Sequence, residues 1–296
     1  MLLYILALFF SLEGGLVNEI IKKIPFGLYS LLFILSLVSY TLRFSRWYYF
    51  LSPLRPDITI SRHLLIYFSG FALTTTPGKL GETIRSVFLS PLGISYHQSL
   101  GAFFSERLLD VVAVVALSAL LFALAFPEYQ QWAILSAALI ITIFLCLRSQ
   151  FIPVILNKFL RHRSKDSIVA FQNHIGQFLG NRSMLTVLPL SLLAWGSQGY
   201  SLYLIVDALG FVTSPLLAIG IYSASILAGA VSFIPGGIGA TEAAIIVLLV
   251  SVGMDLPLAA AASIICRGMT LWLAVIIGLI SMFSLSRRLK INIAKI

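Results

Sequence analysis

The stretch Thr76-Pro77-Gly78-Lys79-Leu80-Gly81-Glu82 lies inside a long apolar run, and a similar stretch, Ile234-Pro235-Gly236-Gly237-Ile238-Gly239-Ala240-Thr241-Glu242, lies in the second half of the chain. Each combines a Pro-Gly step, which interrupts a helix, with a carboxylate. Downstream of each, an arginine, Arg107 or Arg267, falls within another apolar run. A duplicated, broken and charged apolar segment is typical of a membrane transport site.

The composition is that of an integral membrane protein. Hydrophobic residues make up 59% of the 296 positions and charged residues 10%, and the mean hydropathy is +1.00. Several apolar runs approach the roughly 20 residues that a helix needs to cross a hydrocarbon core. Backbone groups in lipid must be satisfied internally, and these runs are too long for barrel strands, so we expect an all-α multi-pass bundle. Residues 1–296 are interpreted as a single membrane domain.

Other function classes find little support. The net charge of +9 comes from residues scattered over loop ends, which favours positive-inside topology and anionic lipid headgroups over nucleic acid. Both cysteines lie within apolar helices, the four histidines lack metal-ligand spacing, and neither glycine-rich stretch completes a P-loop or a dinucleotide loop. We therefore expect no cofactor, no metal and no nucleic-acid partner.

The apolar pattern predicts about six spans and two interrupted segments. The interruption at residues 74–78 leaves two arms of about 12 residues, too short to cross separately, and a second interruption falls near Pro235, so we expect two re-entrant helical hairpins. Two amphipathic stretches, 16–24 and 168–179, are typical of interfacial helices. The expected spans are 1–10 as a short or tilted helix, 26–51, 98–126, 132–147, 184–206 and 258–283, and the hairpins are 63–89 and 215–252.

Basic residues set the expected orientation. The stretch 148–182 is the most positively charged part of the chain, and four basic residues follow the last span, so both should be cytoplasmic. Arg43 and Arg46, beside Trp47, are interpreted as an interfacial belt that ends the span 26–51 inside. We therefore expect an inverted-topology repeat in the cell membrane with both termini cytoplasmic. It consists of half 1 (about 14–126), a connecting span (132–147), a cytoplasmic loop (148–166) and half 2 (about 167–283).

The broken segments also predict the chemistry of the site. Pro77 and Pro235 suit the first turn of a helix, and the glycines after them leave backbone N–H groups exposed at its positive end. Such a helix start binds anions, and a phosphate is the obvious anion in a membrane. The candidate substrate-binding residues are Thr76, Pro77, Gly78, Gly81, Glu82, Arg107, Asp110, Pro235, Gly236, Gly237, Gly239, Glu242 and Arg267.

Arg107 and Arg267 lie near the centres of their spans, where a charge is costly and needs a partner. Arg107 has Asp110 at i+3, whereas Arg267 has no acid nearby in sequence, which leaves Glu242 or Glu82. An internal ion-pair network that locks the helices together without a ligand is the alternative interpretation. Arg85, three residues after Glu82, is interpreted as an exposed or paired interfacial charge rather than as a ligand.

Three blocks of the chain resemble a known family: 76–85 (TPGKLGETIR), 106–110 (ERLLD) and 234–243 (IPGGIGATEA). They are similar to the signature blocks of the flippase-like membrane domain of lysylphosphatidylglycerol synthases, which also occurs alone in bacterial and archaeal membrane proteins. The resemblance covers essentially the whole chain. It implies movement of lipids between leaflets: aminoacylated phosphatidylglycerol in the synthases, and polyprenyl-phosphate-linked sugars or hopanoids elsewhere. These 296 residues lack the synthases' soluble aminoacyl-transferase domain, so lipid aminoacylation is not implied.

We therefore expect a lipid flippase or transporter that moves a phospholipid or a polyprenyl-phosphate-linked lipid and binds its headgroup phosphate between the two hairpin tips. Its partners are membrane lipids that are anionic or carry phosphate, and a homo-oligomer is compatible with the sequence. Glu82 and Glu242 would position or neutralise the arginines, and their protonation is a hypothesis for coupling to a proton gradient. Two alternatives stay open: a membrane enzyme that acts on a lipid-linked sugar, and an accessory subunit of a lipid or envelope pathway.

Overall fold

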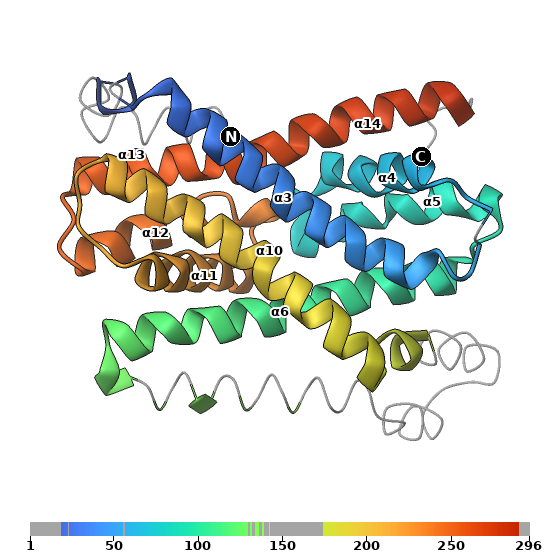
Figure 1. The fold of residues 1–296 in the computed structure, drawn as a ribbon, viewed down its shortest axis with the longest axis horizontal. Helices are drawn as coiled ribbons and strands as arrows, with labels where there is room; N and C mark the ends of the chain where they lie inside the picture. The colour runs from blue at the N-terminus through green and yellow to red at the C-terminus, as the bar shows by residue number, and fades with distance from the viewer. Residues whose placement is uncertain are drawn as a thin grey trace.

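The part of the protein that the structure describes is built from helices and loops (Figure 1). The computed structural model describes residues 19–22, 24–55, 57–129, 131, 134–135, 138, 142 and 174–289, and these residues contain no β-strand. The all-α fold class is thus confirmed for this part of the chain. The predicted helix at 1–10, most of the span at 132–147, the loop at 148–166 and much of both amphipathic stretches lie outside the described residues.

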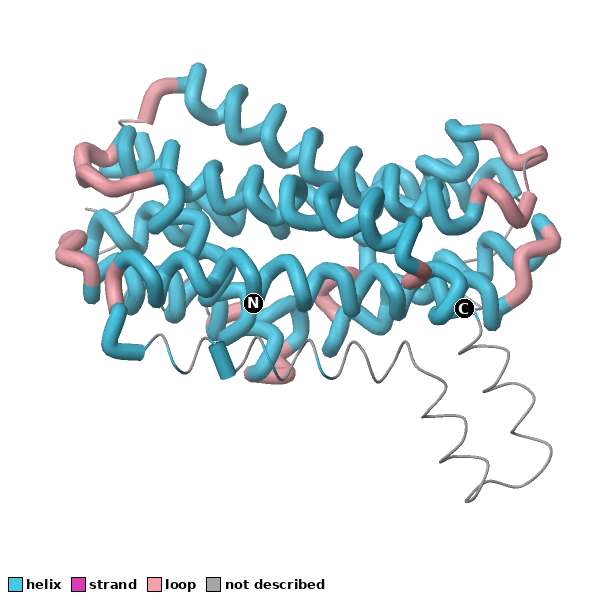
Figure 2. Tube along the Cα trace, turned by 60° about the horizontal axis from the view of Figure 1, so that its bottom comes forward, coloured by secondary structure: helices cyan, strands magenta, loops and turns pink. Residues whose placement is uncertain are grey.

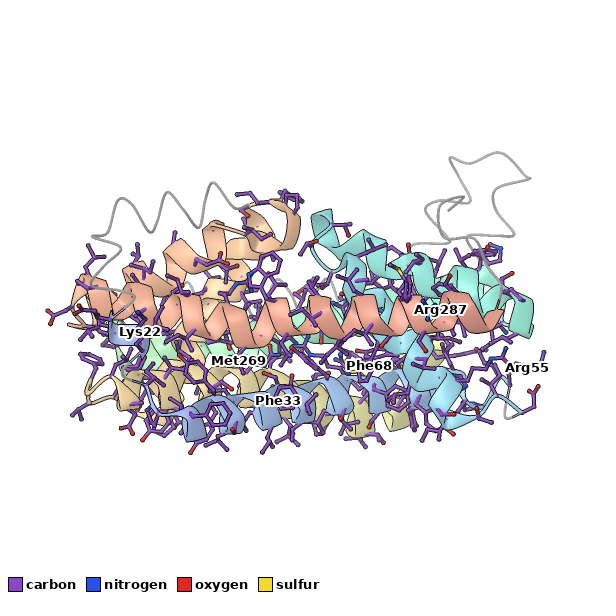
Figure 3. The ribbon with its side chains drawn as sticks, turned by 90° about the horizontal axis from the view of Figure 1, so that it is seen from above. Lys22, Phe33, Arg55, Phe68, Met269 and Arg287 are labelled. Atoms are coloured by element: carbon purple, nitrogen blue, oxygen red, sulfur yellow. The ribbon has the colours of Figure 1, made fainter. Side chains whose placement is uncertain are left out.

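Among the described residues, three helices are long and apolar enough to cross a membrane. They are α3 (Phe26–Leu51), α6 (Tyr96–Leu124) and a last helix that runs through α13 (Leu256–Arg267), a π-helical turn η6 (Gly268–Trp272) and α14 (Leu273–Leu289). Figure 3 shows this last helix extending along the molecule, with Met269 near its middle. The predicted spans 26–51, 98–126 and 258–283 therefore correspond to helices of sufficient length.

A fourth long helix, α10 (Asn181–Ala208), matches the predicted span 184–206 in position. Its 28 residues give a length of about 42 Å, enough to cross a hydrocarbon core of about 30 Å. It is more polar than the other three, and three of its polar side chains, Ser191, Gln198 and Ser201, are buried in the bundle. The polar face of α10 is thus directed towards neighbouring helices.

The two interrupted segments form two pairs of short helices. The first pair consists of α4 (Ile60–Ser69) with η1 (Gly70–Leu73), followed by η2 (Pro77–Ile84), α5 (Arg85–Leu89) and η3 (Ser90–Leu92). The second pair consists of α11 (Pro215–Val231), η5 (Pro235–Gly237) and α12 (Ala240–Ser251). The helical path breaks close to each predicted Pro-Gly step, at residues 74–76 and 232–239, which we call the first break and the second break.

The long helices connect the two pairs. In Figure 1 the first pair lies at the right-hand end of the molecule and the second pair at the left-hand end. α6 packs on α11, α14 packs on α4 and η1, and α3 packs on α10. Figure 2 shows the loops mainly at the two ends of the bundle. A short 3-10 turn, η4 (Pro127–Tyr129), follows α6.

Buried apolar side chains form two clusters. One surrounds the second pair and includes Leu121 and Ile245, and the other surrounds the first pair and includes Phe88 and Leu109. Both clusters contain residues of α3 and α6, which run through the two ends in turn. Each pair therefore has its own core, and the long helices are shared by both.

Two glycines let the long helices approach the pairs closely. A Cβ atom at Gly220 of α11 would lie 2.5 Å from the backbone nitrogen of Leu121 in α6. A Cβ atom at Gly278 of α14 would collide with the backbone nitrogen of Ala72 in η1. Small residues at such positions allow tight helix packing in lipid, where no hydrophobic force drives helices together.

The C-terminal part of α3 does not form the predicted interfacial belt. Arg46 is fully buried, Trp47 is 2% exposed and Arg43 is 6% exposed. Arg55, in the loop after α3, is a more accessible basic residue at this end. Its hydrogen bonds to Asp57 lower the pKa of the Asp57 carboxyl to about 2. The prediction is wrong because arginine beside aromatic residues is also the pattern of a charge cluster inside the bundle.

Candidate functional site

Threonine side chains hold the first break. The Thr76 hydroxyl donates to the Leu73 carbonyl at 2.8 Å and accepts the Gly81 N–H at 2.6 Å. The Thr74 hydroxyl donates to Glu82 Oε1 at 2.8 Å. A Cβ atom at Gly81 would lie 2.6 Å from Leu73 Cβ, so only glycine allows this close approach. The first break is therefore a tight turn in which the Thr74 and Thr76 hydroxyls and the Gly81 N–H are paired.

Three glycines shape the second break. Gly236, Gly237 and Gly239 have φ values of 65°, 62° and 94°, in the left-handed region that favours glycine. The Gly237 N–H donates to the Ile234 carbonyl at 2.8 Å. The Gly239 N–H donates to Glu242 Oε2 at 2.7 Å, so an acid in the first turn of α12 caps its own helix.

The sequence predicts unpaired backbone N–H groups at both helix starts, and this is wrong for three of them. The N–H groups of Gly81, Gly237 and Gly239 all donate to acceptors of the chain itself. The acceptors lie within the same segments, because an unpaired N–H inside an apolar bundle is costly. In this conformation these three N–H groups are not available to an anion, whereas side chains at the breaks could still bind one.

The two breaks meet. η2 contacts η5, and a Cβ atom at Gly236 would lie 3.2 Å from Thr75 Cα. The Gly236 carbonyl accepts a hydrogen bond from Arg267 Nη2 at 2.9 Å. Arg267 Nε donates to Glu242 Oε1 at 2.8 Å, so Arg267 pairs with Glu242 rather than with Glu82. Arg267 therefore anchors the second break at the point where it touches the first.

Six charged side chains beside the first break alternate in sign, and we call them the ion chain. In order of contact they are Arg46, Asp110, Arg107, Glu82, Arg85 and Glu106. Successive N–O distances are 2.7, 3.1, 3.8, 2.8 and 3.1 Å. Three arginines balance three carboxylates, so the formal charge of the ion chain is zero. The Arg107 side chain is 17% exposed and the other five are at most 7% exposed, so Arg107 is the most accessible member.

Arg46 and Arg85 belong to the ion chain although neither is among the site residues predicted from the sequence. Of the two expected states of Arg85, exposed or paired, the structure shows the paired one, and the side chain is buried. Its guanidinium lies 5.1 Å from the ring centroid of Trp47 and 4.8 Å from that of Tyr67. These are cation–π distances. The i, i+3 spacing between Glu82 and Arg85 indicates that these two residues can pair. No local spacing indicates Arg46, because its partner Asp110 lies 64 positions away.

A further polar group joins α3 to α10 and α11. Arg43 Nη2 donates to Gln198 Oε1 at 3.2 Å, and the Tyr222 hydroxyl donates to the same oxygen at 2.8 Å. The Arg43 guanidinium also lies over the Trp195 ring, 4.1 Å from its centroid. Trp195 Nε1–H donates to Asp110 Oδ1 at 2.9 Å, which connects this group to the ion chain.

The structure brings the predicted site residues together around the two breaks. Pro77 begins η2 and Pro235 begins η5, with Gly78 and Gly236 next in each turn. Thr76, Gly81, Glu82, Arg107 and Asp110 surround the first break, while Gly237, Gly239, Glu242 and Arg267 surround the second. Arg107 and Asp110 pair at i, i+3 with 3.1 Å between Nη2 and Oδ2, as their spacing predicts.

Comparison with known proteins identifies the family of this chain. A family model described as the lysylphosphatidylglycerol synthase TM region matches residues 1–278. The chain belongs to this family. A UPF0104 membrane protein of Pyrococcus horikoshii is 24% identical over 266 residues, which cover 79% of this chain and 79% of the relative. A UPF0104 membrane protein of Methanothermobacter thermautotrophicus is 28% identical over 120 residues, which cover 40% of this chain and 36% of the relative.

Membership of the lysylphosphatidylglycerol synthase TM family confirms the resemblance seen in the sequence and links the chain to lipid handling in membranes. The blocks 76–85 and 106–110 supply every member of the ion chain except Arg46. The block 234–243 supplies Glu242 and the glycines of the second break. The residues that carry the resemblance are thus the residues that form the candidate site.

Proposed function

We propose that this protein moves a phosphate-bearing lipid, either a phospholipid or a polyprenyl-phosphate-linked lipid, between the leaflets of the cell membrane. The headgroup passes where the two breaks meet, and Arg107 and Arg267 guide its phosphate. The observation that carries the proposal is the contact between Gly236 and Thr75 beside buried arginine–carboxylate pairs. Charges inside an apolar bundle are expensive and are by default candidates for a transport path.

We also propose that the two interrupted pairs are re-entrant hairpins of an inverted repeat. In this repeat, α3 corresponds to α10, the first pair to the second pair, and α6 to the α13–α14 helix. The main packing contacts of one half then correspond to contacts of the other. The packing of α6 on α11 corresponds to that of α14 on α4, and α3 packs on α10. A repeat of this kind supplies two related conformations that open to opposite sides.

The distribution of basic residues supports the proposed orientation. Figure 3 places Arg55 and Arg287 towards one end of the molecule and Lys22 towards the other. The C-terminal ends of α3 and α14 therefore lie on the same side, as expected if both end in the cytoplasm.

Both arginines are engaged by carboxylates in this conformation. Arg107 lies 3.1 Å from Asp110 and 3.8 Å from Glu82, and Arg267 lies 2.8 Å from Glu242. A phosphate accepts the same hydrogen bonds from a guanidinium as a carboxylate does. The ion pairs close the path when no lipid is present, and the lipid phosphate takes over the arginines as the breaks separate. The interpretation as a locking network and the interpretation as a transport site thus describe two states of one site.

Lipid movement by purified protein in liposomes tests this proposal. A labelled phosphatidylglycerol and a labelled polyprenyl-phosphate lipid are supplied to one leaflet, and their transfer is timed. The protein should accelerate transfer of at least one of them over protein-free liposomes. Arg107→Gln and Arg267→Gln should each slow it about tenfold or more, because each loses charge-assisted hydrogen bonds worth about 1.5–3 kcal/mol. Arg62→Gln, an exposed position on α4, is the matched control and should transfer lipid normally.

Four results would count against the proposal. Failure of the wild-type protein to move either lipid would reject transport, and normal rates in both arginine variants would reject the site. A chemically altered lipid in the same liposomes would favour the membrane enzyme that acts on a lipid-linked sugar. Transfer that appears only after addition of a co-purified partner would favour the accessory subunit.

A further inference from the structure

The interior of this protein carries one more positive than negative charge among the described residues. Five arginines lie within the bundle: Arg43, Arg46, Arg85, Arg107 and Arg267. They face four carboxylates: Glu82, Glu106, Asp110 and Glu242. Of these nine groups, all except Arg43 form an ion pair within 4.0 Å. The surplus charge of the described interior therefore lies on Arg43.

The described contacts of the Arg43 guanidinium are with neutral groups, and the Asp110 carboxylate accepts the Nε1–H of the Trp195 ring on which Arg43 stacks. Nη2 donates to the amide oxygen of Gln198 at 3.2 Å, and one face stacks on Trp195. Nε is buried and has no hydrogen-bond partner in the described part of the chain. An amide dipole and an aromatic ring offset only part of the cost of a buried cation, which is fully met by an anion.

We propose that Arg43, Gln198 and Tyr222 form a binding site for the ionised phosphodiester of a membrane lipid. This inference rests on the proposed function and specifies the headgroup that enters the path. Arg43 Nη2 and the Tyr222 hydroxyl already converge on one oxygen, Gln198 Oε1. A phosphoryl oxygen that takes the place of this amide oxygen accepts from both donors, and Arg43 Nε adds a third donor.

The charge of the site selects between phosphate chemistries. A phosphodiester carries a single negative charge, which balances the surplus on Arg43. A phosphomonoester carries about 1.5 to 2 negative charges at neutral pH and would leave the interior negative. The link from Trp195 to Asp110 connects the bound phosphodiester to the ion chain beside the first break. The site therefore favours a phosphodiester lipid such as phosphatidylglycerol over phosphatidic acid.

Replacement of Gln198 by glutamate tests the site directly. In Gln198→Glu, a carboxylate oxygen replaces the amide oxygen that accepts from Arg43 Nη2 and the Tyr222 hydroxyl. This carboxylate supplies the negative charge that balances Arg43. We expect Gln198→Glu to unfold at a higher temperature than wild type in lipid-free detergent. We also expect Gln198→Glu and Arg43→Gln each to bind dioctanoyl phosphatidylglycerol at least about tenfold more weakly, measured by native mass spectrometry. Arg62→Gln removes one exposed positive charge and should bind like wild type.

Other ligands distinguish the sources of the anion. Diacylglycerol, which has no phosphate, should not bind at this site, and inorganic phosphate should not displace phosphatidylglycerol. Displacement by inorganic phosphate would assign the site to a free anion and overturn the lipid assignment. Tighter binding of phosphatidic acid than of phosphatidylglycerol would overturn the phosphodiester assignment.

Measurements of binding and of transport separate this inference from the proposed function. Wild-type affinity for phosphatidylglycerol in Gln198→Glu would overturn the site, and this variant is decisive if Arg43→Gln does not fold. Arg43-dependent binding by a protein that moves no lipid would leave this inference standing and reject the proposed function. If the protein moves lipid, and neither Gln198→Glu nor Arg43→Gln changes transport or binding, this inference is overturned and the proposed function stands.

Discussion

Single arginines determine what this bundle can do, because each lies among apolar helices and needs a partner. Arg267 pairs with Glu242 at 2.8 Å and also donates to the Gly236 carbonyl, so one side chain joins α13 to the second break. Loss of one partner from a buried pair leaves an uncompensated charge and costs about 3–5 kcal/mol. The same loss from an exposed pair such as Arg55–Asp57 is screened by water.

Glu242→Gln tests this difference. It leaves Arg267 without a carboxylate and weakens the acceptor of the Gly239 N–H, so we expect the free energy of unfolding in detergent to fall by about 3–5 kcal/mol. The double variant with Arg267→Gln should lose less than the sum of the single losses, because the two groups are coupled. Asp57→Asn, which breaks the exposed pair, should leave the unfolding midpoint unchanged. Equal effects of Glu242→Gln and Asp57→Asn would contradict the pairing.

For the two interrupted helix pairs, the local sequence determines where the helix breaks but not how the groups at the break are paired. Proline and glycine act on their own neighbours, so the positions of both breaks follow from the Pro-Gly steps at Pro77 and Pro235. The hydrogen bonding of the Gly81 and Gly239 N–H groups could not be predicted in this way. It depends on the orientation of the Thr76 hydroxyl and the Glu242 carboxylate, which accept these two N–H groups. Local breaks are thus predictable, whereas the pairing of the groups that they release depends on side-chain geometry.

A pair of glycines in the last long helix tests how closely the elements pack. The Cβ atom of Gly278→Ala meets the Ala72 backbone, which cannot rotate away, and overpacking of this kind costs about 1–3 kcal/mol. That cost offsets or exceeds the roughly 1 kcal/mol gained in helix propensity. Gly268→Ala places its Cβ in open space and should keep or raise the unfolding midpoint. Similar midpoints for the two variants would show that α14 and η1 are not in backbone contact.

At the scale of the whole molecule, the described residues form two helix pairs with separate cores, joined by long helices and in contact at their breaks. The helices and the interruptions could be predicted from local pattern. The burial of Arg43 and Arg46 could not, because it depends on Gln198 and Asp110, which distant parts of the chain bring to α3. Charge in a membrane protein is therefore assigned correctly only when the packing of the long helices is known.

The central claim at this scale is that the two breaks must separate for a lipid headgroup to pass. Thr75 and Gly236 offer a direct test, because a Cβ atom at Gly236 would lie 3.4 Å from Thr75 Cβ. This separation is close to the roughly 3.5–4.5 Å between Cβ atoms in a disulfide. Thr75→Cys with Gly236→Cys, in a background with Cys146 and Cys266 replaced by alanine, should therefore form a cross-link between the breaks on oxidation.

The decisive measurement is the rate of labelled phospholipid transfer in liposomes by this double-cysteine protein before and after oxidation. Each single-cysteine variant serves as a control and should be insensitive to the oxidant. We predict that oxidation stops transfer and that reduction restores it. Undiminished transfer by protein whose cross-link is verified by mass spectrometry would contradict the claim that lipid passes between the two breaks.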